Sequence, residues 1–221
     1  MAIADRRKRE REQRRNEIIV AAEKLFFAKG YTNVTMDVIA NEAEVNKALL
    51  YYYFKNKEAL FFAVYRRIVQ VLYKIYEDSS KLDVDGLTKI KAMSEGMHEF
   101  SKSHPDEFRL YIYAGSERFI NTDNEDAKEA TTLATGMWRL VVEAFLQGIE
   151  EGNIRDDLDP VEMSIYFTMI TMNALNVSPV FRMILEARGI NQERFWEDLE
   201  HFIQPALTQQ TLNSPDKQEK S

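Results

Sequence analysis

The sequence predicts an all-α fold, because apolar residues recur at helical spacing, capping residues and prolines mark helix ends, and no stretch alternates as a strand does. In the first predicted helix, Ile18, Ala22 and Leu25 fall on one face. Gly30 follows where a helix C-terminus favours a left-handed residue, so this helix is expected to end there.

Three more helices are expected in quick succession after this glycine. Thr35 is suited to cap a short helix that ends near Ala43, and Asn46 is suited to cap the next one. Asn56 then caps a long helix that runs to about Ser79.

The rest of the chain keeps the helical periodicity. Predicted helices cover residues 84–103, 105–118, 124–151, 160–176, 179–188 and 192–208. Prolines stand in the first turn of three of them, where a missing amide hydrogen costs nothing: Pro105, Pro160 and Pro179. We therefore expect a basic arm (1–17), a helix-turn-helix domain (18–62), a larger helical domain (63–208) and a polar, disordered tail (209–221).

Composition excludes several classes of protein. The chain of 221 residues has no cysteine, which excludes disulfides, thiol catalysis and zinc sites built on thiolates. Its beginning is charged rather than apolar, so no secretory signal is expected. The apolar runs are too short to span a bilayer, and we expect a cytoplasmic protein with no membrane partner.

Charge is distributed unevenly along the chain. The net charge is −7, yet residues 1–60 hold 12 Lys and Arg against 9 Asp and Glu, and the remainder holds 17 against 27. A basic end on an acidic body directs one surface toward phosphate and repels phosphate elsewhere. Because attraction to DNA needs only a local basic patch, the acidic total does not exclude a nucleic-acid partner.

The basic arm admits two compatible interpretations. As a structural element it extends the first helix, with Arg6, Glu10 and Arg14 spaced for ion pairs four residues apart. As a binding element it reaches DNA phosphates or a minor groove. The sequence leaves both interpretations open.

The two short capped helices, joined by a tight turn, have the spacing of a helix-turn-helix. The small Ala40 lets the helices cross closely, while Val45 and Leu50 hold the second helix in place and Leu50 and Phe54 point inward. The second helix then exposes the following residues to a DNA groove, with Tyr51 at the margin: Lys47, Ala48, Leu49, Tyr52 and Tyr53.

The run from Ile19 to Leu60 resembles the DNA-binding domain of the TetR family of transcriptional regulators. The matching features are Ala21-Ala22, Leu25-Phe26, Gly30, Thr35, Ile39-Ala40, Ala43, Val45, Leu50-Tyr51, Tyr53-Phe54 and Lys57-Glu58-Ala59-Leu60. A weaker match, from Gly148 to Gly152 with Arg155 and Asp159-Pro160, resembles the turn before the dimerising helices of that family. The resemblance implies an N-terminal three-helix DNA-binding domain followed by a C-terminal helical bundle for ligand binding and dimerisation.

The resemblance also implies roles for single residues. Thr35 would bind a phosphate of a double-stranded DNA operator through its hydroxyl and amide, and Tyr52 and Lys57 would contact other backbone phosphates. The candidates for base edges and thymine methyls are Lys47, Ala48, Leu49 and Tyr51. Two positions depart from the family pattern. Glu44 stands where glycine is usual, so the turn either strains a glutamate or changes shape, and Ala48-Leu49 replaces a Gly-Thr-like pair.

The larger helical domain is rich in methionine and aromatic side chains, which fill cores and also line adaptable apolar cavities. The candidates to line a cavity for a small apolar or amphipathic effector are Met93, Met97, Phe100, Phe108, Tyr111, Met137, Trp138, Met172, Asn173 and Asn176. Apolar stripes on the last long helices are expected to pair across a two-fold axis in a homodimer, although burial within one chain is the alternative: Phe167, Ile170, Leu175, Phe195, Leu199, Phe202 and Ile203. The function implied is that of a repressor, bound to a palindromic operator as a dimer and released by the effector.

Two other classes of function remain as alternatives. An enzyme would need a phosphate loop, a spaced pair of metal ligands or a nucleophile elbow, and the sequence has none of these, so we expect no catalytic residue, no metal site and no cofactor. A helical protein-interaction module is the second alternative. It leaves unexplained the exposed surface from Lys47 to Tyr53 together with Lys57.

Overall fold

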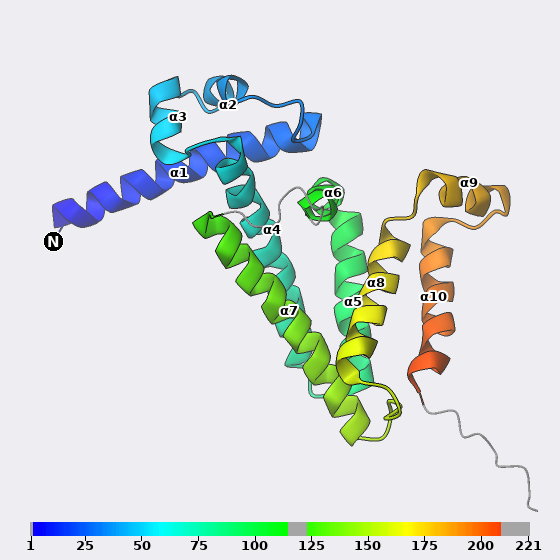
Figure 1. Cartoon of the computed structure of the whole chain (residues 1–221). Helices are drawn as coiled ribbons and strands as arrows, with labels where there is room; N and C mark the ends of the chain where they lie inside the picture. The colour runs from blue at the N-terminus through cyan, green and yellow to red at the C-terminus, as the bar shows by residue number, and fades with distance from the viewer. Residues whose placement is uncertain (1, 115–122, 209–221) are drawn as a thin grey trace, which may run out of the picture. The chain divides into compact units, whose positions relative to one another are not determined.

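The computed structural model describes residues 2–114 and 123–208, and all regular secondary structure within them is helical (Figure 1). The predicted all-α fold is therefore confirmed. The predicted tail at 209–221 and the last residues of the helix expected at 105–118 lie outside the described residues. None of the helices described is both long and apolar enough to cross a membrane.

Ten helices are labelled along the described part of the chain. Their bounds are α1 (Ala2–Lys29), α2 (Met36–Glu42), α3 (Lys47–Tyr53), α4 (Lys57–Ser80), α5 (Gly86–Ser103), α6 (Pro105–Ala114), α7 (Glu125–Glu150), α8 (Pro160–Leu175), α9 (Pro179–Ala187) and α10 (Gln192–Leu207). The bounds expected from capping residues and prolines agree closely with these. The arm at 4–17 is part of α1, so its helical interpretation is confirmed.

The chain divides into two compact units. The first comprises Met1–Asp78 and Gly96–Met137, and the second comprises Ser79–Glu95 and Trp138–Ser221. This division rests on compactness alone, and the functional boundary expected near residue 62 stays a prediction.

The core of the first unit forms where α1 meets the short helices and α4. The apolar stripe of α1 is buried, and the two short helices and α4 each contribute residues to the same core. Its fully or almost fully buried members include Ile18, Ala22, Leu25, Phe26, Ile39, Leu50, Phe54, Leu60 and Phe61. The second helix of the pair is therefore held by buried contacts, as its Leu50 and Phe54 predicted.

The loop between α1 and α2 is fixed by a glycine and an aromatic cluster. Gly30 has a φ of +72°, the left-handed conformation that ends α1. Tyr31 then turns inward, with its ring centroid 4.9 Å from that of Phe61, 5.7 Å from that of Phe26 and 5.9 Å from that of Tyr113. These contacts hold the chain at the point where it enters α2.

The second unit is packed around the first turns of α5 and the end of α7. A Cβ on Gly86 would lie 2.2 Å from the backbone nitrogen of Gly148, so only glycine permits this crossing. Phe145 contacts Phe167 of α8, with ring centroids 6.0 Å apart. Trp196 and Ile203 are the buried residues of α10, whereas α9 has none.

Candidate nucleic-acid interface

Side-chain caps set the start of both short helices. The Thr35 hydroxyl accepts a hydrogen bond from the Val38 amide at 3.3 Å, at the first turn of α2. The Asn46 side chain accepts one from the Leu49 amide at 2.8 Å, at the first turn of α3. Both predicted caps are confirmed, and each ties a free amide at a helix N-terminus to a local acceptor.

The turn between α2 and α3 contains a strained residue. Glu44 has a φ of +52° and is the one residue other than glycine with positive φ in the part of the chain described. The Val45 amide donates to the Ala40 carbonyl at 2.9 Å, which closes the turn. Of the two outcomes open for a glutamate at this position, the structure shows the strained left-handed one.

Helix α3 presents one side to the core and the other to solvent. Leu50 is fully buried, and Phe54, which follows the helix, is 3% exposed. The opposite side carries the predicted DNA-contacting residues: Lys47, Ala48, Tyr51 and Tyr52 are exposed, and Leu49 and Tyr53 are half-buried. Among the tyrosines of this side, Tyr52 is the most exposed, with 65% of its surface accessible.

Lys47 is held by a carboxylate of the preceding helix. Its ammonium lies 2.7 Å from the Asp37 carboxylate, and this hydrogen bond raises the pKa of Lys47 above its ordinary value. Both side chains are mostly exposed, so the pair stabilises the fold little. A phosphate that approaches Lys47 must compete with Asp37 for the ammonium.

Lys57, at the start of α4, contacts the loop before α2. Its ammonium donates to the carbonyl oxygens of Val34 at 2.8 Å, Tyr31 at 2.9 Å and Thr32 at 3.4 Å. These bonds could not be predicted from the sequence, because the partners are 23 to 26 residues away in the chain. A phosphate contact through this ammonium, as the family resemblance implies, would share it with the loop and stays a prediction.

Two arginines of α1 contact aromatic residues at the end of α3, and the sequence does not predict these contacts. The guanidinium of Arg11 lies over the Tyr52 ring, 5.6 Å from its centroid. That of Arg15 lies over the Phe54 ring at 5.1 Å and pairs with Asp126 at 2.6 Å. Asp126 also accepts a hydrogen bond from Arg66 of α4 at 3.0 Å, so one carboxylate joins α1, α4 and α7.

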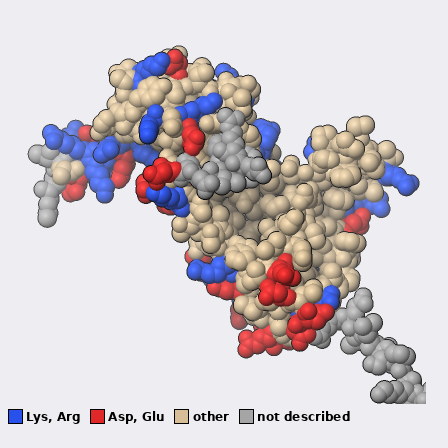
Figure 2. Space-filling view, viewed as in Figure 1, with Lys and Arg blue, Asp and Glu red and all other residues tan. Residues whose placement is uncertain are grey.

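Lysine and arginine side chains are prominent along the N-terminal part of α1 in the space-filling view (Figure 2). Acidic side chains are interspersed with them, as in the pair between Arg6 and Glu10 at 2.7 Å. The surface next to α3 is therefore basic in excess, with internal pairs that reduce but do not cancel the charge.

The predicted effector-binding residues are distributed over both units. In the first unit lie Met97, Phe100, Phe108, Tyr111 and Met137, and in the second lie Met93, Trp138, Met172, Asn173 and Asn176. Most of the methionine and phenylalanine members are buried, which is the environment of ordinary core residues as well. Trp138 is 37% exposed, and Asn173 and Asn176 are exposed on α8 and at its end.

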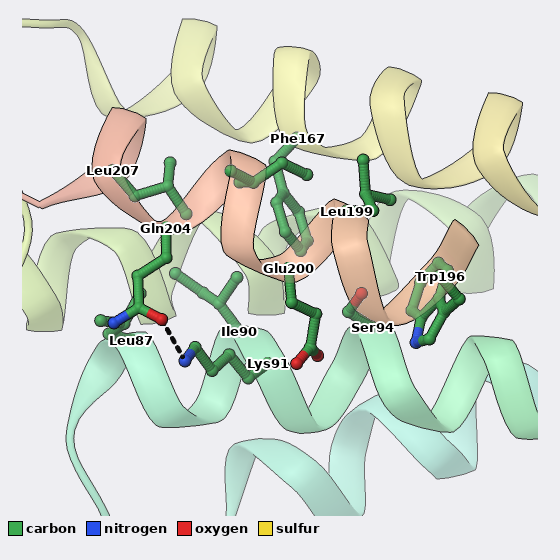
Figure 3. A pocket seen from close by; sticks show the side chains of 11 residues that line it. Leu87, Ile90, Lys91, Ser94, Phe167, Trp196, Leu199, Glu200, Gln204 and Leu207 are labelled. Carbon is green, nitrogen blue, oxygen red and sulfur yellow. Dashed lines mark hydrogen bonds between the residues drawn. The ribbon is translucent and has the colours of Figure 1, made fainter. Parts of the chain in front are cut away.

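The described residues of the second unit line a small cavity and a larger groove. One, of about 30 Å³, lies between α5 and α10, where Lys91 donates to Gln204 at 3.1 Å beside apolar residues such as Ile90 (Figure 3). It has room for a water molecule but not for an effector. The other is a groove of about 640 Å³ among α8, α9 and α10, which we call the α8–α10 groove.

The α8–α10 groove brings together residues from two predicted sets. Asn173 and Asn176, from the effector set, line it together with Ile170, Phe195 and Leu199, from the dimer set. The remaining dimer candidates differ in exposure: Phe202 is 77% exposed, Ile203 is buried, and Phe167 and Leu175 are half-buried. Both assignments stay predictions, and they compete for one surface.

Comparison with known proteins identifies the N-terminal domain. The family "Bacterial regulatory proteins, tetR family" matches residues 18–64, which span the end of α1, both short helices and the start of α4. Residues 18–64 therefore form a TetR-family DNA-binding domain. The resemblance drawn from residues 19–60 is thus confirmed.

Curated relatives of this chain are transcriptional regulators. The activator FasR of Mycolicibacterium smegmatis is 31% identical over 45% of this chain and 46% of its own length. The regulator HbdR of Aromatoleum sp. is 38% identical over 35% of this chain and 32% of its own length. The repressor KstR2 of Mycobacterium tuberculosis is 26% identical over 66% of this chain and 72% of its own length. The chain thus spans less than half the length of the first two.

Solved structures extend the likeness to the whole fold. A ketosteroid transcriptional regulator, KstR2 of Mycobacterium tuberculosis, has a TM-score of 0.65 at 18% identity over 89% of this chain and 96% of its own. AibR, solved with isovaleryl coenzyme A and operator DNA, has a TM-score of 0.67 at 18% identity over 87% and 98%. A regulator from Saccharomonospora viridis, solved with choline, has a TM-score of 0.71 at 18% identity, over 90% of this chain and 100% of its own. At this identity the likeness establishes the TetR-family fold, with its helical domain behind the helix-turn-helix.

Proposed function

We propose that this TetR-family regulator is a dimeric repressor that binds a palindromic DNA operator and is released by a small apolar or amphipathic effector. The observation that carries the proposal is the two-sided packing of α3. Leu50 and Phe54 anchor it to the core while Lys47, Ala48 and Tyr52 remain exposed on its other side. A short, rigid helix with one polar and aromatic face free is what a major groove accepts.

Within this proposal, some residues position the domain on the DNA backbone and others recognise the base sequence. Thr35 and Tyr52 contact phosphates, which fix the head on the duplex. Lys47, Ala48, Leu49 and Tyr51 face the base edges, and Lys47 exchanges the carboxylate of Asp37 for a DNA acceptor. Lys57 stabilises the DNA-binding domain through its hydrogen bonds to the loop that leads into α2.

The dimer is proposed from the apolar surface of the last three helices. Helix α9 buries none of its residues within the chain. Four of its apolar side chains are each more than half exposed: Val180, Phe181, Met183 and Ile184. Contiguous apolar surface of this kind marks an interaction site in a protein. We propose that a second copy covers the α8–α10 groove, which would place Asn173 and Asn176 at the interface.

The effector is proposed to be apolar or amphipathic. Support comes from relatives that are named for a ketosteroid or were solved with choline or isovaleryl coenzyme A. In the first unit, Tyr65, Tyr76 and Tyr111 carry hydroxyls that are protonated at physiological pH and can donate to an effector, and burial raises the pKa of each of them further. Tyr65 and Tyr111 have ring centroids 6.1 Å apart, which keeps two of the hydroxyl-bearing rings together.

The experiment is selection of bound fragments from random and genomic duplex DNA, followed by affinity measurement with purified protein. Tyr52→Ala should weaken binding of the selected duplex at least ten-fold. Tyr52→Phe lacks only the hydroxyl, so its affinity shows how much of that loss is due to the hydroxyl. Effector panels are then tested for release of the duplex and for a rise in melting temperature. If the parent chain selects no duplex sequence, and its affinity for DNA is no higher than that of an acidic control protein that does not bind DNA, the proposed function is wrong.

A further inference from the structure

Helix α1 carries a continuous stripe whose character changes midway. Ile18, Ala22 and Leu25 form its apolar part and are buried in the core of the first unit. The same spacing of three and four residues continues toward the N-terminus through Arg14, Arg11 and Arg7. The face that packs under the short helices is therefore the face that presents arginine further along the same helix.

The contact between Arg11 and Tyr52 locates this basic stripe. The guanidinium lies over the ring of Tyr52, which is itself 65% exposed on the free side of α3. Helix α1 continues past α3 toward its N-terminus (Figure 1), and Arg7 lies one turn beyond Arg11, about 6 Å along the axis. Arg7 therefore projects beside the surface through which α3 is proposed to meet DNA.

Ion pairs within the N-terminal part of α1 involve some of its basic side chains and not others. Arg6, Lys8 and Arg14 pair with glutamates of the same helix, at 2.7, 4.0 and 2.8 Å. Arg7 and Arg9 are exposed and have no ion-pair partner within the described part of the chain. They are two residues apart, about 200° around the helix, so Arg7 lies on the stripe and Arg9 lies on the opposite face.

We propose that Arg7 and Arg11 bind phosphates of the DNA that flanks the major groove occupied by α3. Guanidinium groups match phosphate geometry and stay charged at any physiological pH. A backbone contact is favoured over the minor groove, because an α-helix is about 10 Å wide and the minor groove of B-DNA is about 6 Å wide. The arm then acts as a rigid support along one strand, and this inference rests on the proposed function.

The test uses a duplex selected by the protein from random DNA, prepared with long flanks and with flanks trimmed to the selected sequence. Arg7→Gln should lower the slope of log affinity against log salt concentration by about 0.9 for each head of the dimer. The corresponding loss of affinity near physiological salt is roughly five-fold for each head. Arg9→Gln is the matched control, since it removes the same unpaired charge from the opposite face, and circular dichroism checks that both variants keep their helical content.

The flank length provides a second readout. On the trimmed duplex the parent chain should fall to the affinity and salt slope of a double variant, Arg7→Gln with Arg11→Gln, measured on the long duplex, and this double variant should be insensitive to trimming. Equal slopes for the Arg7 and Arg9 variants, or a parent chain that is insensitive to trimming, would overturn the inference and leave specific DNA binding intact. A parent chain that binds no duplex would overturn the proposed function itself.

Discussion

The ammonium of Lys57 lies 4.3 Å above the centroid of the Tyr31 ring and donates a hydrogen bond to the carbonyl oxygen of the same residue. This lysine therefore contributes a cation–π contact and a charged hydrogen bond at one point of the loop between α1 and α2. Tyr31 also anchors that loop to Phe61 of α4. The start of α4 and the entry to α2 are consequently fixed to each other, which holds the short helices in place.

Lys57→Met should lower the free energy of unfolding by about 2 kcal/mol, because three backbone carbonyls lose a charged donor. Urea denaturation measures the change, and Lys55→Met, an exposed lysine close by, is the control that should change little. The salt slope of DNA binding tests the phosphate contact predicted for Lys57, and the slope stays unchanged if the ammonium holds only the loop. A stability equal to that of the parent chain, together with a lower slope, would assign Lys57 to phosphate binding instead.

Glu44→Gly should raise the free energy of unfolding by about 1 kcal/mol, because glycine adopts the left-handed conformation at this turn without steric cost. Glu44→Ala removes the same carboxylate and keeps the strained backbone, so it separates conformation from charge. Thermal and urea unfolding of the three proteins provide the comparison. Equal stabilisation by glycine and alanine would show that the charge, and not the backbone, is responsible.

Asp37→Asn should tighten duplex binding several-fold, because it frees the ammonium of Lys47 and removes a negative charge next to the proposed phosphate-facing side. Fluorescence anisotropy at several salt concentrations measures the effect. Asp198→Asn, on α10, removes the same charge far along the chain and is expected to be neutral. Weaker binding by Asp37→Asn would mean that the carboxylate orients Lys47 for DNA.

Phe181→Glu should convert the dimer to a folded monomer, because it places a charge at a side chain that is 64% exposed in one chain and lines the α8–α10 groove. Sedimentation velocity measures the mass, and circular dichroism measures the helical content. Val71→Glu, at an apolar residue of α4 that is 48% exposed, is the control that should leave the dimer intact. A parent chain that is already monomeric at micromolar concentration would contradict the proposed interface.

The elements that the sequence predicted best are those set by local chemistry. Thr35, Asn46 and Asn56 each accept a hydrogen bond from an amide three residues later, so a capping residue at the right spacing is enough to place the helix start. The unusual residue of the turn, Glu44, is also visible from local sequence, although the sequence leaves open whether the glutamate is strained or the turn changes shape.

The contacts that the sequence could not predict join residues distant in the chain. Arg15 and Asp126 are separated by 111 positions, and nothing in either neighbourhood indicates the other. The effector candidates have mainly their residue type in common, and methionine and phenylalanine fill cores as well as line cavities. Only the packing of the helices shows that Asn173 and Asn176 share a groove with residues expected at a dimer interface.

The carboxylate of Asp126 binds side chains of two helices, α1 and α4. It pairs with Arg15 of α1 at 2.6 Å and with Arg66 of α4 at 3.0 Å, while its own backbone belongs to the first turn of α7. Any displacement of that turn must break a bond or move both arginines together. Helices α1 and α4 are thereby mechanically coupled at this point, so a shift that begins in α7 cannot reach one of them without the other.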